Sequence, residues 1–195
     1  MAEELTRIVQ ERFLNSIIGT HDYRGQETMV IKREGLLELM QFLRDDPAMA
    51  VDFLMDLTCV DYLKFGRSLQ SAPTLATSSP LPYFMKPKPV AERWERSVSN
   101  EPFRFELVYH LYSTRHHHRL RVKVPLTLSD LAVDSLAGLW ASANWFEREV
   151  WDLFGITFRG HPNLKRILMY EGFQGHPLRK DYPIRKRQPL VGPVN

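Results

Sequence analysis

The sequence predicts an α+β fold: a small mixed sheet with an antiparallel hairpin, packed by about three helices and followed by an extended C-terminal strap. Three observations support this fold class. Apolar residues recur at helical spacing in 3–18 and 35–43, they alternate with polar residues between 103 and 124, and no regular period follows residue 155. We therefore expect an α+β body over residues 1–155 and a basic strap over residues 156–195.

Length and composition restrict the class of protein. The chain has 195 residues, of which 44% are hydrophobic and 25% are charged, as in an ordinary globular domain. Its single cysteine, Cys59, cannot close an internal disulfide, and it cannot by itself supply a cysteine-rich zinc site or an iron–sulfur cluster. No apolar run reaches the roughly 18 to 20 residues that a membrane-spanning helix needs. We expect no bound metal, no bound cofactor and no membrane span.

The first half of the body is predicted as helix, strand, helix and strand. The first helix covers residues 3–18 and ends at Gly19, a short β-branched strand covers 28–31, and a second helix covers 35–43. Residues 53–62 alternate imperfectly between apolar and polar, which predicts a strand over the second half of that segment.

Residues 66–100 differ in composition from the rest of the body. Five of the 13 prolines lie here among serine, threonine and lysine, and proline excludes both a helix interior and a central strand. We interpret the segment as a solvated proline-rich insertion. The alternative is a docking segment that uses Tyr83, Phe84 and Trp94.

Two alternating runs, 103–111 and 120–124, predict the antiparallel hairpin. The link between them holds His116, His117 and His118, and imidazole is the commonest zinc ligand. Consecutive side chains on a turn diverge, however, and no other histidine or cysteine stands nearby at the spacing that closes a metal site. We expect solvated loop histidines.

A final helix is predicted over residues 144–154, with Asn144 as its cap, Glu147 completing a capping box and Gly155 ending it. Its charged residues are Glu147, Arg148, Glu149 and Asp152. Three carboxylates around one arginine could form a metal or acid–base site. A charged helix face beside a basic segment is the commoner arrangement, and we favour it.

The charge of the chain is concentrated in the strap. Residues 159–187 contain eight bases and two acids, hence a net charge of +6, which leaves 18 bases and 21 acids, hence −3, in the rest. This asymmetry indicates that the strap docks on something acidic, either a protein surface or nucleic acid.

The strap contains two near-copies of one short motif, spaced 15 residues apart. Gly160-His161-Pro162 precedes the basic pair Lys165-Arg166, and Gly175-His176-Pro177 precedes the basic pair Arg179-Lys180. Glycine permits a sharp turn and proline favours an extended histidine, so each unit can present its bases to a surface. No nucleophile elbow, phosphate-binding loop or zinc-binding helix motif accompanies the histidines. We interpret the motif as structural.

The last helix and the strap resemble one family along a long pattern. The residues that carry the resemblance are Trp145-Phe146-Glu147-Arg148-Glu149-Val150-Trp151-Asp152-Leu153-Phe154-Gly155-Ile156, then Gly160-His161-Pro162, Lys165-Arg166-Ile167-Leu168 and Gly175-His176-Pro177-Leu178-Arg179-Lys180-Asp181-Tyr182-Pro183. They resemble the C subunit of respiratory complex I, which is the 30 kDa subunit in mitochondria. The hairpin and the strand before it resemble that family too, so the resemblance covers most of residues 28–183. Residues 66–100 and 189–195 depart from it.

The resemblance implies a non-catalytic peripheral-arm subunit of NADH:quinone oxidoreductase, a proton-translocating complex. Such a protein would clamp the quinone-site protein, the D subunit, on the cytoplasmic side of the inner membrane, and would touch the membrane only through the complex. NADH, FMN, iron–sulfur clusters and quinone would be handled by other subunits. The same resemblance would also fit a related hydrogenase-type or other donor complex.

The partner-binding residues that we predict all lie on the last helix and the strap. They are Glu147, Arg148, Glu149, Asp152, His161, Lys165, Arg166, His176, Arg179, Lys180, Asp181 and Tyr182. No catalytic, cofactor-binding or metal-binding residue is predicted. We further expect residues 156–187 to gain their order only against the partner, because the segment has no regular period and no matching acidic run.

Two other classes of function stay open on the residues alone. A nucleic-acid-binding module would use the basic strap for phosphates and Tyr170, Phe173 and Tyr182 for base stacking. A stand-alone hydrolase would use His161 and His176 with the helix carboxylates, and would show metal-dependent turnover.

Overall fold

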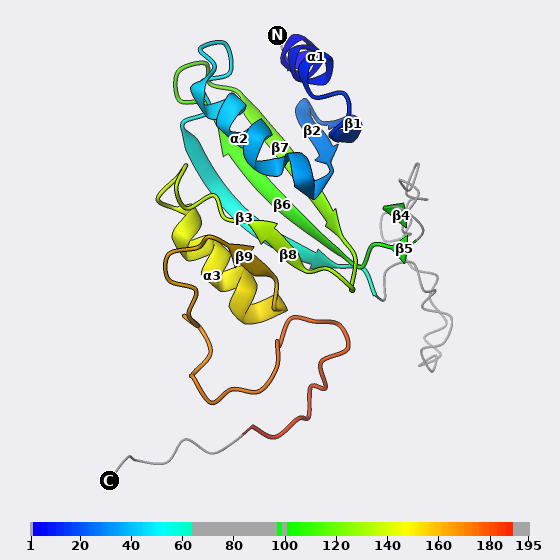
Figure 1. Cartoon of the computed structure of the whole chain (residues 1–195), viewed down its shortest axis with the longest axis vertical. Helices are drawn as coiled ribbons and strands as arrows, with labels where there is room; N and C mark the ends of the chain where they lie inside the picture. The colour runs from blue at the N-terminus through cyan, green and yellow to red at the C-terminus, as the bar shows by residue number, and fades with distance from the viewer. Residues whose placement is uncertain (1, 64–96, 99–100, 189–195) are drawn as a thin grey trace, which may run out of the picture.

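A five-stranded mixed sheet forms the body in the computed structural model, with helices packed on one of its faces (Figure 1). The structure describes residues 2–63, 97–98 and 101–188. The proline-rich insertion, with Tyr83, Phe84 and Trp94, and the segment 189–195 lie outside the described residues. The predicted α+β class with an antiparallel hairpin is confirmed.

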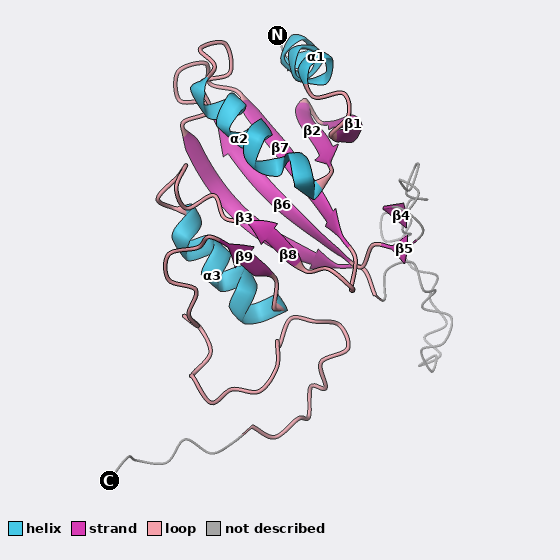
Figure 2. Cartoon of the chain, in the orientation of Figure 1, coloured by secondary structure: helices cyan, strands magenta, loops and turns pink. Residues whose placement is uncertain are grey.

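Figure 2 shows the helices in cyan and the strands in magenta, and Figure 1 colours the same elements in chain order. The helices are α1 (Ala2–Arg12), α2 (Leu36–Asp45), which a short 3-10 turn at Arg33–Gly35 precedes, and α3 (Ala143–Phe154). The strands of the main sheet are β1 (Ile17–Tyr23), β2 (Gln26–Ile31), β3 (Phe53–Asp61), β6 (Phe105–Tyr112) and β7 (Arg119–Leu126). The shorter strands are β4 (Ser97–Val98), β5 (Glu101–Pro102), β8 (Ala132–Asp134) and β9 (Thr157–Arg159).

The sheet has the strand order β1-β2-β7-β6-β3. Strands β2 and β7 run parallel, and the other neighbours run antiparallel, so the sheet is mixed. Period-two alternation sends one set of side chains to the helices and the other set to the opposite face. All three helices contribute buried residues to the same apolar cluster as the inward residues of the sheet, among them Met29, Leu57 and Tyr109.

The first helix is shorter than the sequence predicts. It ends at Arg12, and the residues predicted as its last turn begin strand β1 instead. Ile17 lies at helical spacing from Phe13, which made the two conformations hard to separate from the pattern alone. The chain is extended rather than helical at Ile17 because strand β1 pairs with β2 through a tight turn at Arg24 and Gly25, where φ is 56° and 74°.

Two further predictions are corrected. Strand β3 covers all of Phe53–Asp61, not only the second half of the segment, because β6 pairs with it along its length apart from a bulge after Leu54. Helix α3 begins at Ala143 and no side chain caps it, so Asn144 is not its cap and Glu147 completes no capping box. Glu147 turns inward instead.

The strap does not begin as irregular chain. Ile156 and Phe158 are buried in the core, and β9 pairs in parallel with β8 over Thr157–Arg159, so these residues belong to the body. A short parallel pair of this kind depends on a partner that lies 25 residues earlier in the chain, which no local period reveals.

Candidate functional site: the strap and its anchors on α3

Helix α3 holds the strap through a buried carboxylate. One oxygen of Asp152 accepts the backbone N–H groups of Ile167, Leu168 and Met169 at 3.1, 2.9 and 2.9 Å. The other oxygen accepts Nη1 of Arg166 at 2.6 Å. Burial by itself would raise the pKa of Asp152, but these four donors outweigh burial and hold the pKa below its ordinary value. The carboxylate stays charged and fixes the chain over 166–169.

The second Gly-His-Pro unit caps the C-terminus of α3. The last turn of a helix leaves carbonyl groups without intrahelical partners. Three donors of the strap reach the carbonyl groups of Asp152, Leu153 and Phe154. Nδ1 of His176 donates to the first at 3.0 Å. The amide of Leu178 donates to the second at 3.2 Å, and Nε of Arg179 donates to the third at 2.6 Å. The strap therefore completes the hydrogen bonding of the helix end.

Gly155 makes this approach possible. Its φ of 74° is the left-handed conformation that glycine adopts at helix ends. A Cβ at this position would lie 2.5 Å from Nε2 of His176 and 2.7 Å from Nη2 of Arg179. Glycine is therefore required here for the backbone and for the space.

The first Gly-His-Pro unit contacts the start of α3. Nδ1 of His161 accepts the amide of Asn163 at 3.0 Å, which places the imidazole proton on Nε2. Nε2 then donates to the carbonyl of Asn144 at 3.0 Å. Its side chain is fully buried, 3.9 Å from Oε2 of Glu147.

Glu147 is a buried carboxyl group between α3 and the preceding loop. It accepts the amide of Leu136 and the hydroxyl of Ser135, each at 2.6 Å. Burial raises the pKa of Glu147 to about 7, and the two donors counter only part of that effect.

A second buried acid anchors the strap to the end of the sheet. The carboxylate of Asp61 on β3 accepts hydrogen bonds from Nε and Nη2 of Arg104 at 3.1 and 2.9 Å. It also accepts a hydrogen bond from the amide of Lys180 at 2.8 Å. Arg104 in turn donates to both oxygens of Asp181 at 3.0 and 2.7 Å. Neither Asp61 nor Arg104 was among the predicted site residues, although both are charged residues beside apolar strands.

The twelve predicted residues therefore divide into three groups. Glu147 is buried and bonds the loop before α3 through Ser135 and Leu136. Six others hold the strap against the body through side-chain contacts: Arg148, Asp152, His161, Arg166, His176 and Arg179. Arg148 belongs to this group because its Nε donates to the carbonyl of Lys165 at 3.0 Å. The expectation that the strap orders only against a partner is wrong, because these contacts order it against its own chain.

The other five have side chains that are partly or fully exposed. Glu149, Lys165 and Lys180 are exposed, Asp181 is exposed but paired with Arg104, and Tyr182 is half-buried. Tyr182 stacks on Phe173 at 6.0 Å between ring centroids, and Phe173 meets Tyr170 edge-on at 5.7 Å. These rings are therefore engaged with one another, which argues against the alternative that they stack on nucleic-acid bases.

Comparison with known proteins identifies the family. Residues 29–188 match the family described as the respiratory-chain NADH dehydrogenase, 30 Kd subunit. The chain belongs to this family.

The relatives agree with the match. The C subunit of NADH-quinone oxidoreductase from Citrifermentans bemidjiense is 40% identical over 98% of each chain. The same subunit from Legionella pneumophila strain Paris is 41% identical over 93% of this chain and 78% of the relative. The subunit from Coxiella burnetii strain RSA 493 is 39% identical over 94% of this chain and 80% of the relative.

Two solved structures share the fold. The trypsin-resistant fragment (1–134) of Nqo5 is 30% identical, with a TM-score of 0.56, over 84% of this chain and all of its own. A chain of the archaeal membrane-bound sulfane sulfur reductase has a TM-score of 0.61 at 18% identity, over 94% and 86%, and shows the fold alone.

The family assigns this chain to complex I. It is a member of the 30 kDa subunit family of the respiratory-chain NADH–quinone oxidoreductase, and it partners with other subunits of that complex. In the part of the chain that the structure describes, no helix combines the length and the apolar character that crossing a bilayer requires.

Proposed function

We propose that this protein is a docking subunit without catalytic residues of its own, and that its strap holds the quinone-site subunit on the cytoplasmic side of the inner membrane. The observation that carries the proposal is the division of charge in the strap. Arg159 pairs with Asp134 and Arg166 with Asp152, while Asp181 pairs with Arg104. The remaining bases of the strap have no carboxylate partner among the described residues.

The outer surface of the strap has the composition of a protein interface. We name it the strap surface and define it by its exposed apolar and basic residues: Lys165, Leu168, Leu178, Lys180, Ile184, Arg185, Lys186 and Arg187. Ile184 is 100% exposed, and Leu168 and Leu178 are 56% and 46% exposed. Apolar side chains that stay in water beside unpaired bases favour an acidic protein partner with apolar pockets.

We further propose that the flavin and the iron–sulfur clusters of the complex are held by other subunits. Cys59 is the single thiol in the sequence, and burial raises its pKa, which disfavours the thiolate that binds metals. Iron and flavin analysis of the purified chain tests this. Stoichiometric iron, or a flavin spectrum that survives gel filtration, contradicts it.

The docking proposal is tested by charge reversal on the strap surface. The double variant Arg185→Glu with Arg187→Glu changes exposed residues that have no hydrogen bond or ion pair within the described chain, so the fold should keep its thermal midpoint. Capture of the quinone-site subunit by the variant should fall by at least about tenfold, because reversed charges now oppose the acidic partner. The loss should be larger at low salt.

A matched control reverses two exposed bases at the opposite end of the sheet. Arg24 lies in the turn between β1 and β2, and Arg115 lies in the link between β6 and β7. Arg24→Glu with Arg115→Glu should leave capture unchanged. Undiminished capture by the strap variant would move the interface to the α+β body. Tight, steeply salt-dependent retention of the isolated chain on nucleic acid, or metal-dependent hydrolysis by it, would favour the rival classes.

A further inference from the structure

The main sheet has a second face that the described helices leave uncovered. The main apolar cluster packs against the helices, and Val30 and Val108, which pair with Lys123, are the buried apolar side chains that register places on the opposite face. Strand register places one polar row across the opposite face: Thr28 pairs with Arg121, Arg121 with His110, and His110 with Asp56. Met55 and Val60 on β3 are also exposed there, by 37% and 36%. We name this surface the open face.

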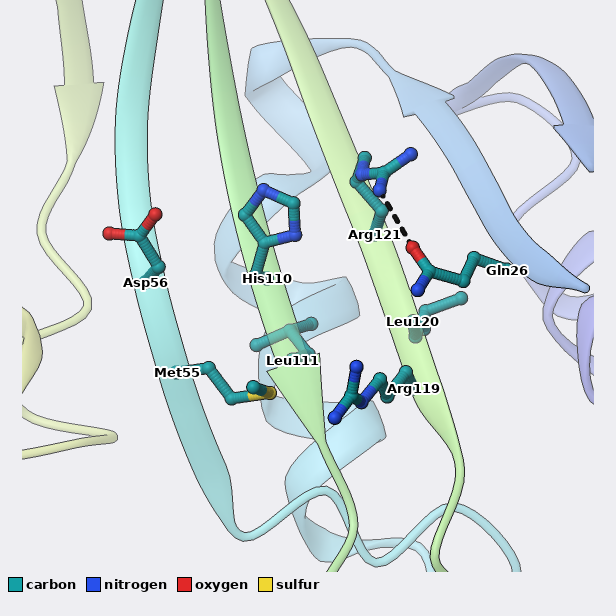
Figure 3. Close-up of a pocket in the computed structure, with 8 residues that line it drawn as sticks. All are labelled: Gln26, Met55, Asp56, His110, Leu111, Arg119, Leu120 and Arg121. Atoms are coloured by element: carbon teal, nitrogen blue, oxygen red, sulfur yellow. Dashed lines mark hydrogen bonds between the residues drawn. The ribbon is translucent and has the colours of Figure 1, made fainter. Parts of the chain in front are cut away.

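A pocket of about 330 Å³ lies on the open face (Figure 3). Its lining comes from β2, β3, β6 and β7 and consists of Gln26, Met55, Asp56, His110, Leu111, Arg119, Leu120 and Arg121. Figure 3 shows Arg119 and His110 directed into the space between β3 and β7, with Met55 opposite Arg119. Two arginines and one aspartate give the pocket an excess of positive charge.

Neither arginine of the pocket is neutralised by an ion pair within the described residues. Arg121 donates to neutral acceptors, Oε1 of Gln26 at 2.9 Å and Oγ1 of Thr28 at 3.4 Å. Arg119 is exposed and makes no hydrogen bond or ion pair with any described residue. Lys123, the next base on β7 whose side chain points to the open face, does have an ion pair, because its Nζ lies 2.9 Å from Oε2 of Glu106.

The remaining groups of the pocket do not supply the missing negative charge. Asp56 faces His110 across the strand pair, on the far side from Arg121. Partial burial lowers the pKa of His110, and the neighbouring Arg121 lowers it further, so the imidazole is neutral at pH 7 and can accept or donate one hydrogen bond.

We propose that this pocket receives an acidic side chain of a neighbouring complex I subunit, with Arg119 as its principal charge partner and Met55 packing beside it. The exposed Met55 side chain in the pocket favours a protein segment over a free anion, because an anion would gain nothing from an apolar neighbour. Arginine with apolar neighbours is also the composition of the energetically important centre of protein interfaces. The proposal rests on the chain acting as a docking subunit, but it uses a different surface from the strap.

The test uses the assembled complex purified from the membrane. A photoreactive benzoyl-phenylalanine replaces Met55, and the cross-linked peptide is identified by mass spectrometry. We expect a peptide from another subunit that contains Asp or Glu. Arg119→Glu should lower the cross-link yield by at least about tenfold, and Arg119→Lys should retain most of it.

Arg115→Glu is the matched control, because it makes the same charge change four residues away and outside the pocket. It should leave the yield unchanged. A cross-link to residues 64–96 of this chain, to a second copy of it or to lipid alone would overturn the proposal, as would an unchanged yield in Arg119→Glu.

Failure here is distinct from failure of the strap proposal. If the strap does not bind the quinone-site subunit, its charge-reversed variant still assembles and the Met55 cross-link still forms. If the pocket is empty, the cross-link is lost while capture through the strap persists.

Discussion

Asp152 and Glu147 are buried carboxyl groups on the same helix, yet their surroundings shift their pKa values in opposite directions. Four donors surround Asp152, and they outweigh the effect of burial. Two donors contact Glu147, and burial dominates. Asp152 is therefore charged at neutral pH, whereas Glu147, whose pKa is about 7, is partly protonated there.

Asp152→Asn should destabilise the protein at pH 7 by on the order of 3 kcal/mol, because an amide cannot satisfy Arg166 and three backbone donors together. The pKa of Asp152 is lowered in the folded state, so its contribution is present above the unfolded pKa and is lost as the pH falls. Urea unfolding from pH 7 to pH 3 should show the variant and the wild type converging. Trypsin should also cleave the variant faster within the strap.

The control for this experiment is Glu149→Gln, because Glu149 is exposed on the same helix. It should unfold like the wild type. Equal stability of Asp152→Asn and Glu149→Gln at pH 7 would show that the carboxylate does not anchor the strap.

Glu147→Gln should remove a pH dependence from the unfolding free energy. The ordinary pKa of 4.5 applies in the unfolded chain and the pKa of about 7 in the folded chain. Between these pH values the unfolded state has released the proton that the folded state keeps, so stability falls as the pH rises. The loss is at most about 3 kcal/mol. A glutamine side chain does not titrate, so the unfolding free energy of the variant should rise relative to that of the wild type from pH 4.5 to 7. Unfolding free energies that change in parallel with pH would contradict the raised pKa.

At the scale of elements, helix α3 and the strap supply each other's missing hydrogen-bond partners. His176, Leu178 and Arg179 supply donors to the carbonyls that the last helical turn leaves open. The helix therefore orders the strap, and the strap satisfies the helix end, so the two should unfold together.

Gly155→Ala should separate these elements. The left-handed backbone costs an alanine about 1 to 2 kcal/mol, and its Cβ would also displace His176 and Arg179. Hydrogen exchange at the amide of Leu178 should accelerate, because its bond to the carbonyl of Leu153 is lost.

Gly138→Ala is the control, since no atom lies within 4 Å of the added Cβ and φ is not in the left-handed range. It should be neutral or slightly stabilising. If hydrogen exchange at the Leu178 amide is equally slow in both variants, Gly155 does not govern the approach of the strap to α3.

At the scale of the molecule, one arginine joins the strap to the sheet. Arg104 bonds Asp61 at the end of β3 and Asp181 in the strap, and the amide of Lys180 bonds Asp61 as well. Asp61 is buried, so loss of Arg104 would leave an uncompensated charge in the protein. The same contacts place the strap surface at one end of the sheet and leave the open face free, which permits two partners at once.

Deleting Gln70 to Arg93 should leave folding and assembly intact. The chain on either side of the insertion is already held together, because the amide of Tyr62 donates to the carbonyl of Arg104 at 2.8 Å. Shortening a loop between fixed ends changes its closure cost by only about 0.6 kcal/mol per twofold change in length. Thermal melting and recovery of the complex measure the outcome. A folded variant that no longer assembles would show that the insertion binds a partner.

Much of the fold and of the family could be predicted from the sequence. Local apolar periodicity predicts α2 and the hairpin of β6 and β7, because each depends on neighbours within a few turns or one strand length. Helix α3 is predicted from a cap at Asn144 that the structure does not show and from Gly155, which does end it. The motif from Trp145 to Pro183 predicts the family, and the charge asymmetry predicts a basic strap. These features are fixed by residue type and spacing alone.

Only the tertiary structure decided which charged residues face inward. Arg104 and Asp61 are 43 residues apart, and Lys180 and Asp61 are 119 apart, so no local pattern links them. Periodicity reports where apolar side chains are buried; it does not report which polar groups pair. Arg166 and Arg179 therefore resembled partner-binding bases in the sequence and are internal anchors in the fold, because buried carboxylates and open helix carbonyls must find donors.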